Sequence, residues 1–141
     1  MNVRFVASVS PIVADGAAAR AFYRDAIGID FEEDEGGYAF THRLDGVKHF
    51  GLWLLADAAR SCFGTGEWPA GVPVPQASIE FEVDDVAAAA AELEAAGHRL
   101  LHGARVEPWG QETARLLAPD GLLVAVCRTP WLREDDAGAP G

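Results

Sequence analysis

Basic side chains are scarce in this chain. Its 141 residues include 11 lysines and arginines against 22 aspartates and glutamates, and the formal net charge is -11. Lys48 is the single lysine. A surface this acidic repels phosphate backbones, so nucleic acid is excluded as the expected partner. The same field attracts cations, including cationic small molecules, although acidity also simply keeps a protein soluble.

Cysteine and long apolar runs are lacking as well. The two cysteines, Cys62 and Cys127, form no disulfide framework and do not have the spacing of metal ligands. No stretch approaches the ~20 apolar residues of a membrane span, and the N-terminus does not resemble a signal peptide. We therefore expect a cytoplasmic protein with no membrane partner. Half of its residues are hydrophobic, which is enough to bury a core.

The first half of the chain predicts the pattern βαβββ. Residues 4–13 favour a strand, and a helix over 17–26 is expected between an N-cap at Asp15 and a stop at Gly28. Three short strands separated by glycine-containing turns are expected next, over 29–33, 38–42 and 48–55.

The second half repeats this pattern, with Asp84 and Asp85 offering the N-cap of its helix. The expected elements are a strand over 77–83, a helix over 86–96, and strands over 98–101, 112–118 and 122–128. A repeat of this size means that one structural unit is used twice, with each unit covering the open sheet of the other. The predicted fold class is therefore α+β, with two βαβββ modules over residues 1–56 and 77–132.

Residues 57–76 are expected to connect the modules as a loop, in which Cys62 also falls. This segment is rich in glycine and proline but carries Phe63 and Trp68, which favours a lid over a plain spacer. The tail, residues 133–141, is acidic and then rich in glycine and proline, which predicts disorder. The chain is thus expected to form a single domain over residues 1–135.

Short motifs in a fixed order make the chain similar to a known superfamily. They are Pro11-Ile12-Val13-Ala14-Asp15, Ala21-Phe22-Tyr23, Ile27-Gly28, Ile79-Glu80-Phe81-Glu82-Val83-Asp84-Asp85, Glu107-Pro108-Trp109-Gly110 and Pro119-Asp120-Gly121. The ordered set resembles the glyoxalase/bleomycin resistance protein/extradiol dioxygenase (vicinal oxygen chelate) superfamily. The resemblance implies an open, curved mixed sheet or barrel, in which each module forms half of a pocket, and a homodimer.

Metal enzymes of that superfamily hold their ion on strands that face the pocket. By the resemblance, three ligand positions fall on Ser8, Ser78 and Ala125, and the fourth falls within residues 49–55, where only His49 could bind a metal. A divalent metal needs about three or four nitrogen, oxygen or sulfur ligands, which serine and alanine do not supply. We therefore expect no metal and no cofactor. The closest resemblance is to the metal-free bleomycin-resistance proteins, which sequester an antibiotic at the dimer interface.

Strand alternation and loop aromatics suggest the ligand-binding residues. If Ser78 faces the pocket, so do Glu80 and Glu82, which could bind a cation, act as acid and base, or lie solvated at the rim. The same alternation turns Leu123, Ala125 and Cys127 inward. The remaining candidates are Ser8, Tyr38, Phe40, His49 and Trp53 on strands, and Phe63, Trp68, Trp109 and Gly110 in loops. Flat or cationic ligands bind on aromatic rings, although the strand aromatics could also be ordinary core.

Several functions remain open at this point. The expected function is that of a homodimeric, metal-free protein that sequesters a hydrophobic or aromatic antibiotic or natural product in pockets at the dimer interface and so confers resistance. The acidic charge of the chain would favour a cationic ligand. The alternative is an enzyme: a lyase, isomerase or dioxygenase with displaced metal ligands, or a metal-free enzyme with Glu80 or Glu82 as base. A regulatory or partner-binding module is the third. No catalytic residue is assigned, because no Ser/His/Asp set or phosphate-binding loop is recognisable.

Overall fold

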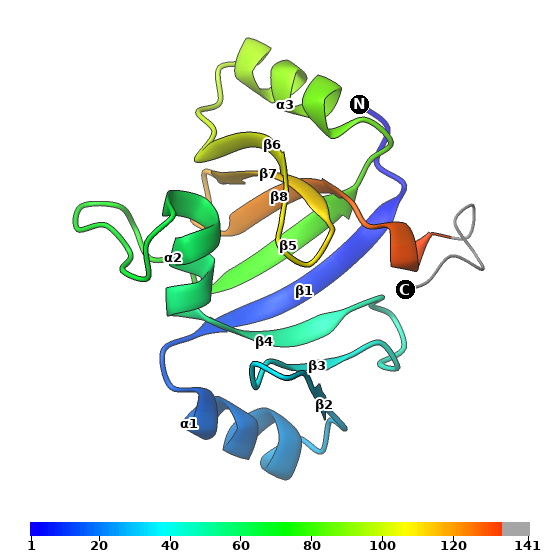
Figure 1. The fold of residues 1–141 in the computed structure, drawn as a ribbon, viewed down its shortest axis with the longest axis vertical. Coiled ribbons are helices and arrows are strands. Elements are labelled where there is room, and N and C mark those ends of the chain that lie inside the picture. The colour runs from blue at the N-terminus through cyan, green and yellow to red at the C-terminus, as the bar shows by residue number, and fades with distance from the viewer. Residues whose placement is uncertain (134–141) are drawn as a thin grey trace.

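One mixed, eight-stranded sheet runs through the computed structural model, which describes residues 1–133 (Figure 1). The first module consists of β1 (Phe5–Val13), α1 (Gly16–Arg20), a π-helical continuation η1 (Ala21–Ala26), β2 (Glu32–Glu33), β3 (Ala39–Thr41) and β4 (Phe50–Leu54). The second consists of β5 (Ala77–Glu82), α3 (Val86–Ala95), β6 (His102–Val106), β7 (Glu112–Leu117) and β8 (Leu123–Arg128). The strand order is β2-β3-β4-β1-β5-β8-β7-β6, which confirms the predicted fold class.

The two modules meet at the central strands β1 and β5 of the same chain. These strands are antiparallel, and their register places Ser8 opposite Glu80 and Ser10 opposite Ser78. Within each module the first and last strands are parallel, β1 with β4 and β5 with β8. The repeat seen in the sequence is therefore a structural repeat around the β1–β5 pair.

Both module helices begin at the predicted caps. The side chain of Asp15 accepts a hydrogen bond from the Ala18 amide at 3.0 Å, and Asp85 accepts one from Ala88 at 3.0 Å. Such caps satisfy amides that the first turn of a helix leaves free. Figure 1 shows α1 and α3 at opposite ends of the sheet.

The helices cover one face of the sheet. Ala19 of α1 packs with Ala39 and Leu52, whereas α3 packs with Ala114 and Val126. Because side chains alternate along a strand, the neighbours of these residues on β3, β4 and β7 point to the other face. That face carries the candidate site.

The segment between the modules is not the continuous loop that its composition predicted. Leu55–Phe63 forms the helix α2, which ends at Gly64 with a left-handed φ of 79°. Residues 55–63 contain no glycine or proline, so the helix-breaking residues of the segment all lie beyond it. Cys62, expected in the loop, is thus a buried residue of α2.

Two strand predictions also need correction. Residues 98–101 form no strand, because the His98 amide still bonds to the Leu93 carbonyl at 3.0 Å and so closes the end of α3. The strand β6 begins only at His102. The strand expected over 29–33 is reduced to the two residues of β2.

The described chain ends with the 3₁₀ turn η2 (Pro130–Leu132) and Arg133. Arg133, expected to start a disordered tail, is 5% exposed and donates to Glu82 at 3.1 Å. The rest of that predicted tail, residues 134–141, lies outside the described residues. Within residues 1–133, none of the helices has both the length and the apolar character needed to cross a bilayer.

Candidate functional site

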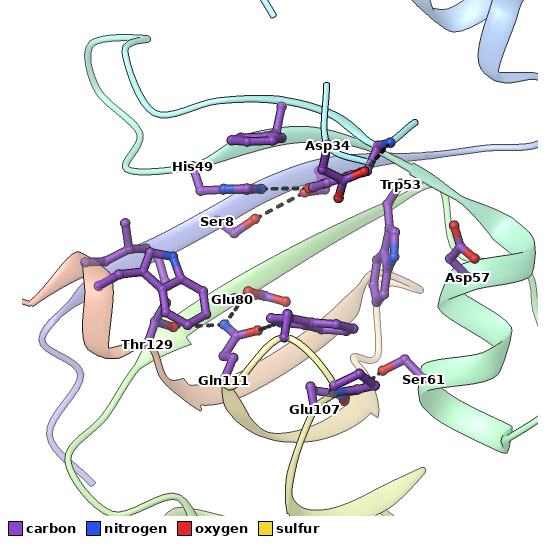
Figure 2. A pocket seen from close by; sticks show the side chains of 18 of the residues that line it. Ser8, Asp34, His49, Trp53, Asp57, Ser61, Glu80, Glu107, Gln111 and Thr129 are labelled. Carbon is purple, nitrogen blue, oxygen red and sulfur yellow. Dashed lines mark hydrogen bonds between the residues drawn. The ribbon is translucent and has the colours of Figure 1, made fainter. Parts of the chain in front are cut away.

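A cavity of about 860 Å³ lies against the sheet face opposite α1 and α3. Both modules line it, through β1, β3 and β4 from the first and β5, β7 and the turn before β7 from the second. Helix α2 and the turn η2 complete its sides. Figure 2 shows His49 and Gln111 on opposite sides of this space, with Glu80 between them and Trp53 at one side.

Stacked rings form the first-module wall. The ring of His49 lies nearly parallel to those of Tyr38 and Phe40, with interplanar angles of 17° and 7°. The Tyr38 hydroxyl lies 2.6 Å from His49 Nε2, and His42 Nε2 lies 2.8 Å from His49 Nδ1. These contacts fix the rings as one flat surface on the cavity side of β3 and β4.

Gly51 makes room for this wall. A Cβ on Gly51 would overlap the Tyr38 hydroxyl. A side chain at position 51 would therefore push the phenol away from His49. The glycine is required here for close approach of a neighbouring group, since its own φ is not left-handed.

Burial changes the acid–base behaviour of both groups. It lowers the pKa of His49 to about 4, and the nearby charge of His42 adds to this effect. Burial also raises the pKa of the Tyr38 hydroxyl, with a further contribution from Glu80. The wall is therefore uncharged near neutral pH at these two residues.

A buried arginine lies at the second-module side of the cavity. Arg115, with 0% exposure, donates from Nε to Ser61 Oγ at 3.0 Å, and its Nη1 lies 3.1 Å from Glu80 Oε2. Ser61 in turn donates to Glu107 at 2.9 Å. The Trp53 ring covers the guanidinium, with its centroid 4.8 Å from the central carbon. The strand β7 thus places one cation between two carboxylates.

The contacts of Arg115 leave part of its hydrogen-bonding capacity unused. Nη1 is near Glu80 but not in hydrogen-bond geometry, and Nη2 has no partner within the described residues. Unused buried donors are costly, because they have lost water without a replacement. An acceptor delivered into the cavity would relieve this cost.

Trp109 stands at the edge of the cavity in a fixed orientation. Its indole Nε1 donates to Gln111 Oε1 at 2.9 Å, while Gln111 Nε2 donates to Glu80 and Thr129. The side chain of Trp109 is nevertheless 47% exposed. An oriented but exposed ring is suited to stacking, because it does not contribute its full area to the core.

The structure brings together seven of the twelve candidate site residues. Ser8, Tyr38, Phe40, His49, Trp53, Glu80 and Trp109 line the cavity. The other five, Phe63, Trp68, Ser78, Glu82 and Gly110, are not part of its lining.

Three of the excluded candidates have structural roles in loops. The ring of Trp68 packs edge-on against Phe63 at 4.9 Å, and its Nε1 donates to the Val72 and Pro73 carbonyls. This pair holds the segment after α2 together and lies outside the cavity lining. Gly110 adopts a φ of 92° in the turn that presents Trp109. Its role is therefore conformational.

The inward face of the second module is filled more tightly than alternation predicted. Glu82 is fully buried and accepts hydrogen bonds from the Thr129 amide at 2.7 Å and from Arg133, so it anchors the end of the chain. Ser78 is also buried, as are Leu123, Ala125 and Cys127. None of these residues lines the cavity.

Several lining residues were not among the candidates. They are Asp34, His42, Asp57, Arg60, Ser61, Arg105, Glu107, Gln111, Arg115, Thr129 and Trp131, together with Ala7, Ser10, Gly36, Val106, Pro108 and Leu132. Arg115 carried a usable signal, since it alternates with Ala114 and Leu116, whose apolar side chains belong against the helix. Trp131 carried none, because it comes from a short turn at the end of the domain.

The positions of the family's metal ligands do not provide a metal site. Ser8 Oγ is occupied by a contact to Ser10 Oγ at 3.1 Å, and Ala125 has only a methyl group. Among residues 1–133 no group of three or more His, Cys, Asp or Glu side chains is arranged to hold an ion. The donor set therefore does not fit a metal.

Comparison with known proteins identifies the family. The model of the Glyoxalase/Bleomycin resistance protein/Dioxygenase superfamily matches residues 6–126. The chain belongs to this superfamily. A search of curated proteins finds no match.

Solved structures share the superfamily fold. A glyoxalase/bleomycin resistance protein/dioxygenase superfamily member from Vibrio splendidus 12B01 aligns with a TM-score of 0.60 and 18% identity, over 91% of this chain and 100% of that one. A Streptomyces coelicolor methylmalonyl-CoA epimerase aligns with a TM-score of 0.53 and 19% identity, over 91% and 96%. Identities this low establish the glyoxalase/bleomycin-resistance fold alone.

Proposed function

We propose that this chain is a metal-free binding protein that sequesters a flat aromatic small molecule, such as an antibiotic or another natural product, in the cavity described above. The observation that carries the proposal is the pair of aromatic surfaces at that cavity: the Tyr38–Phe40–His49 stack from one module and Trp109 from the other. Its volume of about 860 Å³ lies in the range of about 300–1,000 Å³ typical of small-molecule sites.

Charge narrows the ligand class. The lining contains four carboxylates, Asp34, Asp57, Glu80 and Glu107, and three guanidiniums, Arg60, Arg105 and Arg115. One carboxylate in excess, within a chain of net charge -11, favours a neutral or singly cationic molecule over an anion.

The geometry supports binding better than catalysis. Glu80, the candidate base, has one oxygen bonded to Gln111 at 2.9 Å and the other beside Arg115 at 3.1 Å. Glu82 lies outside the cavity lining. Neither carboxylate is therefore free to take a proton from a bound molecule.

Direct binding tests this proposal. Purified protein is titrated with a panel of planar aromatic antibiotics while tryptophan fluorescence is followed, before and after treatment with a chelator. We expect saturable quenching at one ligand per chain, unchanged by chelation, with the ligand recovered intact by mass spectrometry. Chemical conversion of the ligand, or binding that requires about one metal per chain, would contradict the proposal.

The homodimer remains a second part of the proposal. The cavity is lined by both modules of one chain, whereas the family resemblance places the pocket at the dimer interface. Light scattering at micromolar concentration should nevertheless give about twice the monomer mass, as two-fold association is the commonest form of assembly. A monomer that binds ligand would remove the dimer and leave the binding function standing.

A further inference from the structure

The carboxylate of Glu80 lies at the base of the cavity, between its two aromatic surfaces. Glu80 belongs to β5, and the pair β1–β5 stands in the sheet order between β3 and β4 on one side and β7 on the other. The first side carries the Tyr38–Phe40–His49 stack, and the turn before β7 carries Trp109. Figure 2 shows Glu80 within the space between them. A flat ring held between the two surfaces therefore presents its edge to this carboxylate.

The carboxylate of Glu80 has acceptor capacity that the protein leaves unused. Gln111 Nε2 donates to Oε1 at 2.9 Å, and Oε2 lies 3.1 Å from Arg115 Nη1 but outside hydrogen-bond geometry. Within residues 1–133, Glu80 accepts no other hydrogen bond. A carboxylate has about four lone-pair sites, so at least about two remain for a further donor.

The cavity is the side from which a further donor can reach Glu80. The residue is 9% exposed and belongs to the cavity lining, so its exposed part faces this space. Its charge also acts on the opposite wall, because burial raises the pKa of the Tyr38 hydroxyl and Glu80 raises it further. A donor that enters the cavity thus meets a carboxylate that has lost most of its water. Hydrogen bonds to a charged group in such surroundings are stronger than those between neutral groups.

The other three carboxylates of the lining are less suited to hold a ligand. Asp34 and Asp57 are exposed, and each already has partners: Asp34 accepts two backbone amides, and Asp57 pairs with an arginine at 2.7 Å. Water competes for exposed groups, so a ligand gains little from them. Glu107 is 4% exposed, and its Oε1 already accepts from Ser61 and Thr113, both at 2.9 Å. The carboxylate on β5 therefore combines burial, access from the cavity and spare acceptor sites.

We propose that Glu80 is the polar anchor of the cavity and that it accepts an N–H or O–H group at the edge of the bound ring. The ligand class is thereby narrowed to flat aromatic molecules with a hydrogen-bond donor on one edge. The ligand keeps its proton, in keeping with the partners that Gln111 and Arg115 already provide for both carboxylate oxygens. This inference rests on the proposed function, because it concerns the ligand of the same cavity.

Three probes of nearly equal shape test the proposal: carbazole, fluorene and dibenzofuran. At the same ring position they present an N–H donor, a methylene and an ether oxygen. Their affinities are measured by equilibrium dialysis at neutral pH. We expect carbazole to bind about tenfold more tightly than fluorene, which is the worth of one hydrogen bond to a charged group. Dibenzofuran should bind most weakly, because its oxygen faces the carboxylate. Hydrophobic burial alone predicts that fluorene binds more tightly than carbazole, since a methylene is more apolar than an N–H.

Matched variants locate the contact. The double variant Glu80→Met/Arg115→Met replaces the buried ion pair by apolar side chains, a change that folded proteins often tolerate. Fluorene should still bind to it, whereas the preference for carbazole should be lost. Asp57→Asn removes another lining carboxylate and should retain the preference, whatever its effect on the affinity of all three probes. A preference that survives in the double variant, or that disappears in Asp57→Asn, overturns the proposal.

A spectroscopic signature reports the contact directly. The N–H proton of nitrogen-15-labelled carbazole should lie further downfield when bound to the wild-type chain than when bound to the double variant, because a hydrogen bond to a carboxylate deshields the proton. The same N–H position in both proteins overturns the inference. If the double variant does not fold, the ranking of the three probes on the wild-type chain decides.

The outcomes separate this inference from the proposed function. Binding of all three probes with equal affinity, or with fluorene ahead of carbazole, overturns the role of Glu80 and leaves aromatic binding intact. If none of the three probes binds, the proposed function fails, and the inference fails with it.

Discussion

The hydroxyl of Tyr38 occupies the space that a side chain at Gly51 would need. Gly51 lies on β4 and Tyr38 directly precedes β3, which pairs with β4 in antiparallel register. Their contact lets the phenol lie flat in the wall and reach His49. The aromatic surface of the cavity thus depends on the absence of a side chain at one position.

Replacement of Gly51 by alanine should damage both the wall and the fold. The added methyl must displace Tyr38, and overpacking of this kind costs about 1–3 kcal/mol in the free energy of unfolding. Urea denaturation and probe affinity should both report the loss. Gly103→Ala is the control, since a Cβ there meets nothing within 4 Å. An alanine at position 51 with wild-type stability and affinity would show that Tyr38 has another acceptable position.

Replacement of Arg115 by methionine should destabilise the protein strongly. The change leaves Glu80 and Glu107 without their shared buried cation, and breaking a buried ion pair typically costs about 3–5 kcal/mol. The double variant Arg115→Met/Glu80→Gln should recover part of this loss in urea denaturation. Arg24→Met, at an exposed arginine paired with its neighbour Asp25, should change stability little. Equal losses in the single and double variants would contradict the ion-pair explanation.

Trp109 and Trp68 offer a matched comparison of a cavity ring with a loop ring. Trp109→Ala should reduce probe affinity several-fold, because a stacked ring contributes about 0.5–1.5 kcal/mol beyond its burial. Its effect on the melting temperature should be small, as the ring is already about half exposed. Trp68→Ala should lower the melting temperature and leave affinity unchanged, since Trp68 contacts Phe63 and not the cavity. The reverse pattern would move the site to the loop.

Acid should weaken the fold through His49. Its pKa is about 4 in the folded chain, below the ordinary value of about 6.5 expected after unfolding. Between these values the unfolded state binds more protons, so the free energy of unfolding falls as the pH is lowered from about 6.5 to about 4. His49→Gln should flatten this part of the curve measured by urea denaturation, whereas His98→Gln should not. An unchanged slope in His49→Gln would assign the acid sensitivity to other groups.

Local signals in the sequence were enough for the module helices and most of the strands. Asp15 and Asp85 each precede a run of alanines, and both bind the amide three residues on, as the capping pattern requires. The strands of the second module alternate clearly, and β5, β7 and β8 begin within one residue of their predicted starts. These features depend on neighbours along the chain, which a sequence displays directly.

Contacts between distant segments were much harder to predict. Ser61 lies on α2, a helix in a segment whose composition predicted a loop. It forms hydrogen bonds with Arg115 and Glu107 of the second module. Alternation predicts Glu82 in the pocket because it shows only which face of the strand a side chain is on. It does not show that Glu82 is fully buried and bonded to Arg133, 51 residues away. The polar side of the cavity could therefore not be assembled without the fold.

The antiparallel pair β1–β5 joins the two modules at the base of the cavity. The first module contributes Tyr38 and His49 to the cavity lining, and the second contributes Trp109 and Arg115. A ligand that contacts both modules opposes any motion that separates them. The free energy of ligand binding therefore also stabilises the association of the two modules.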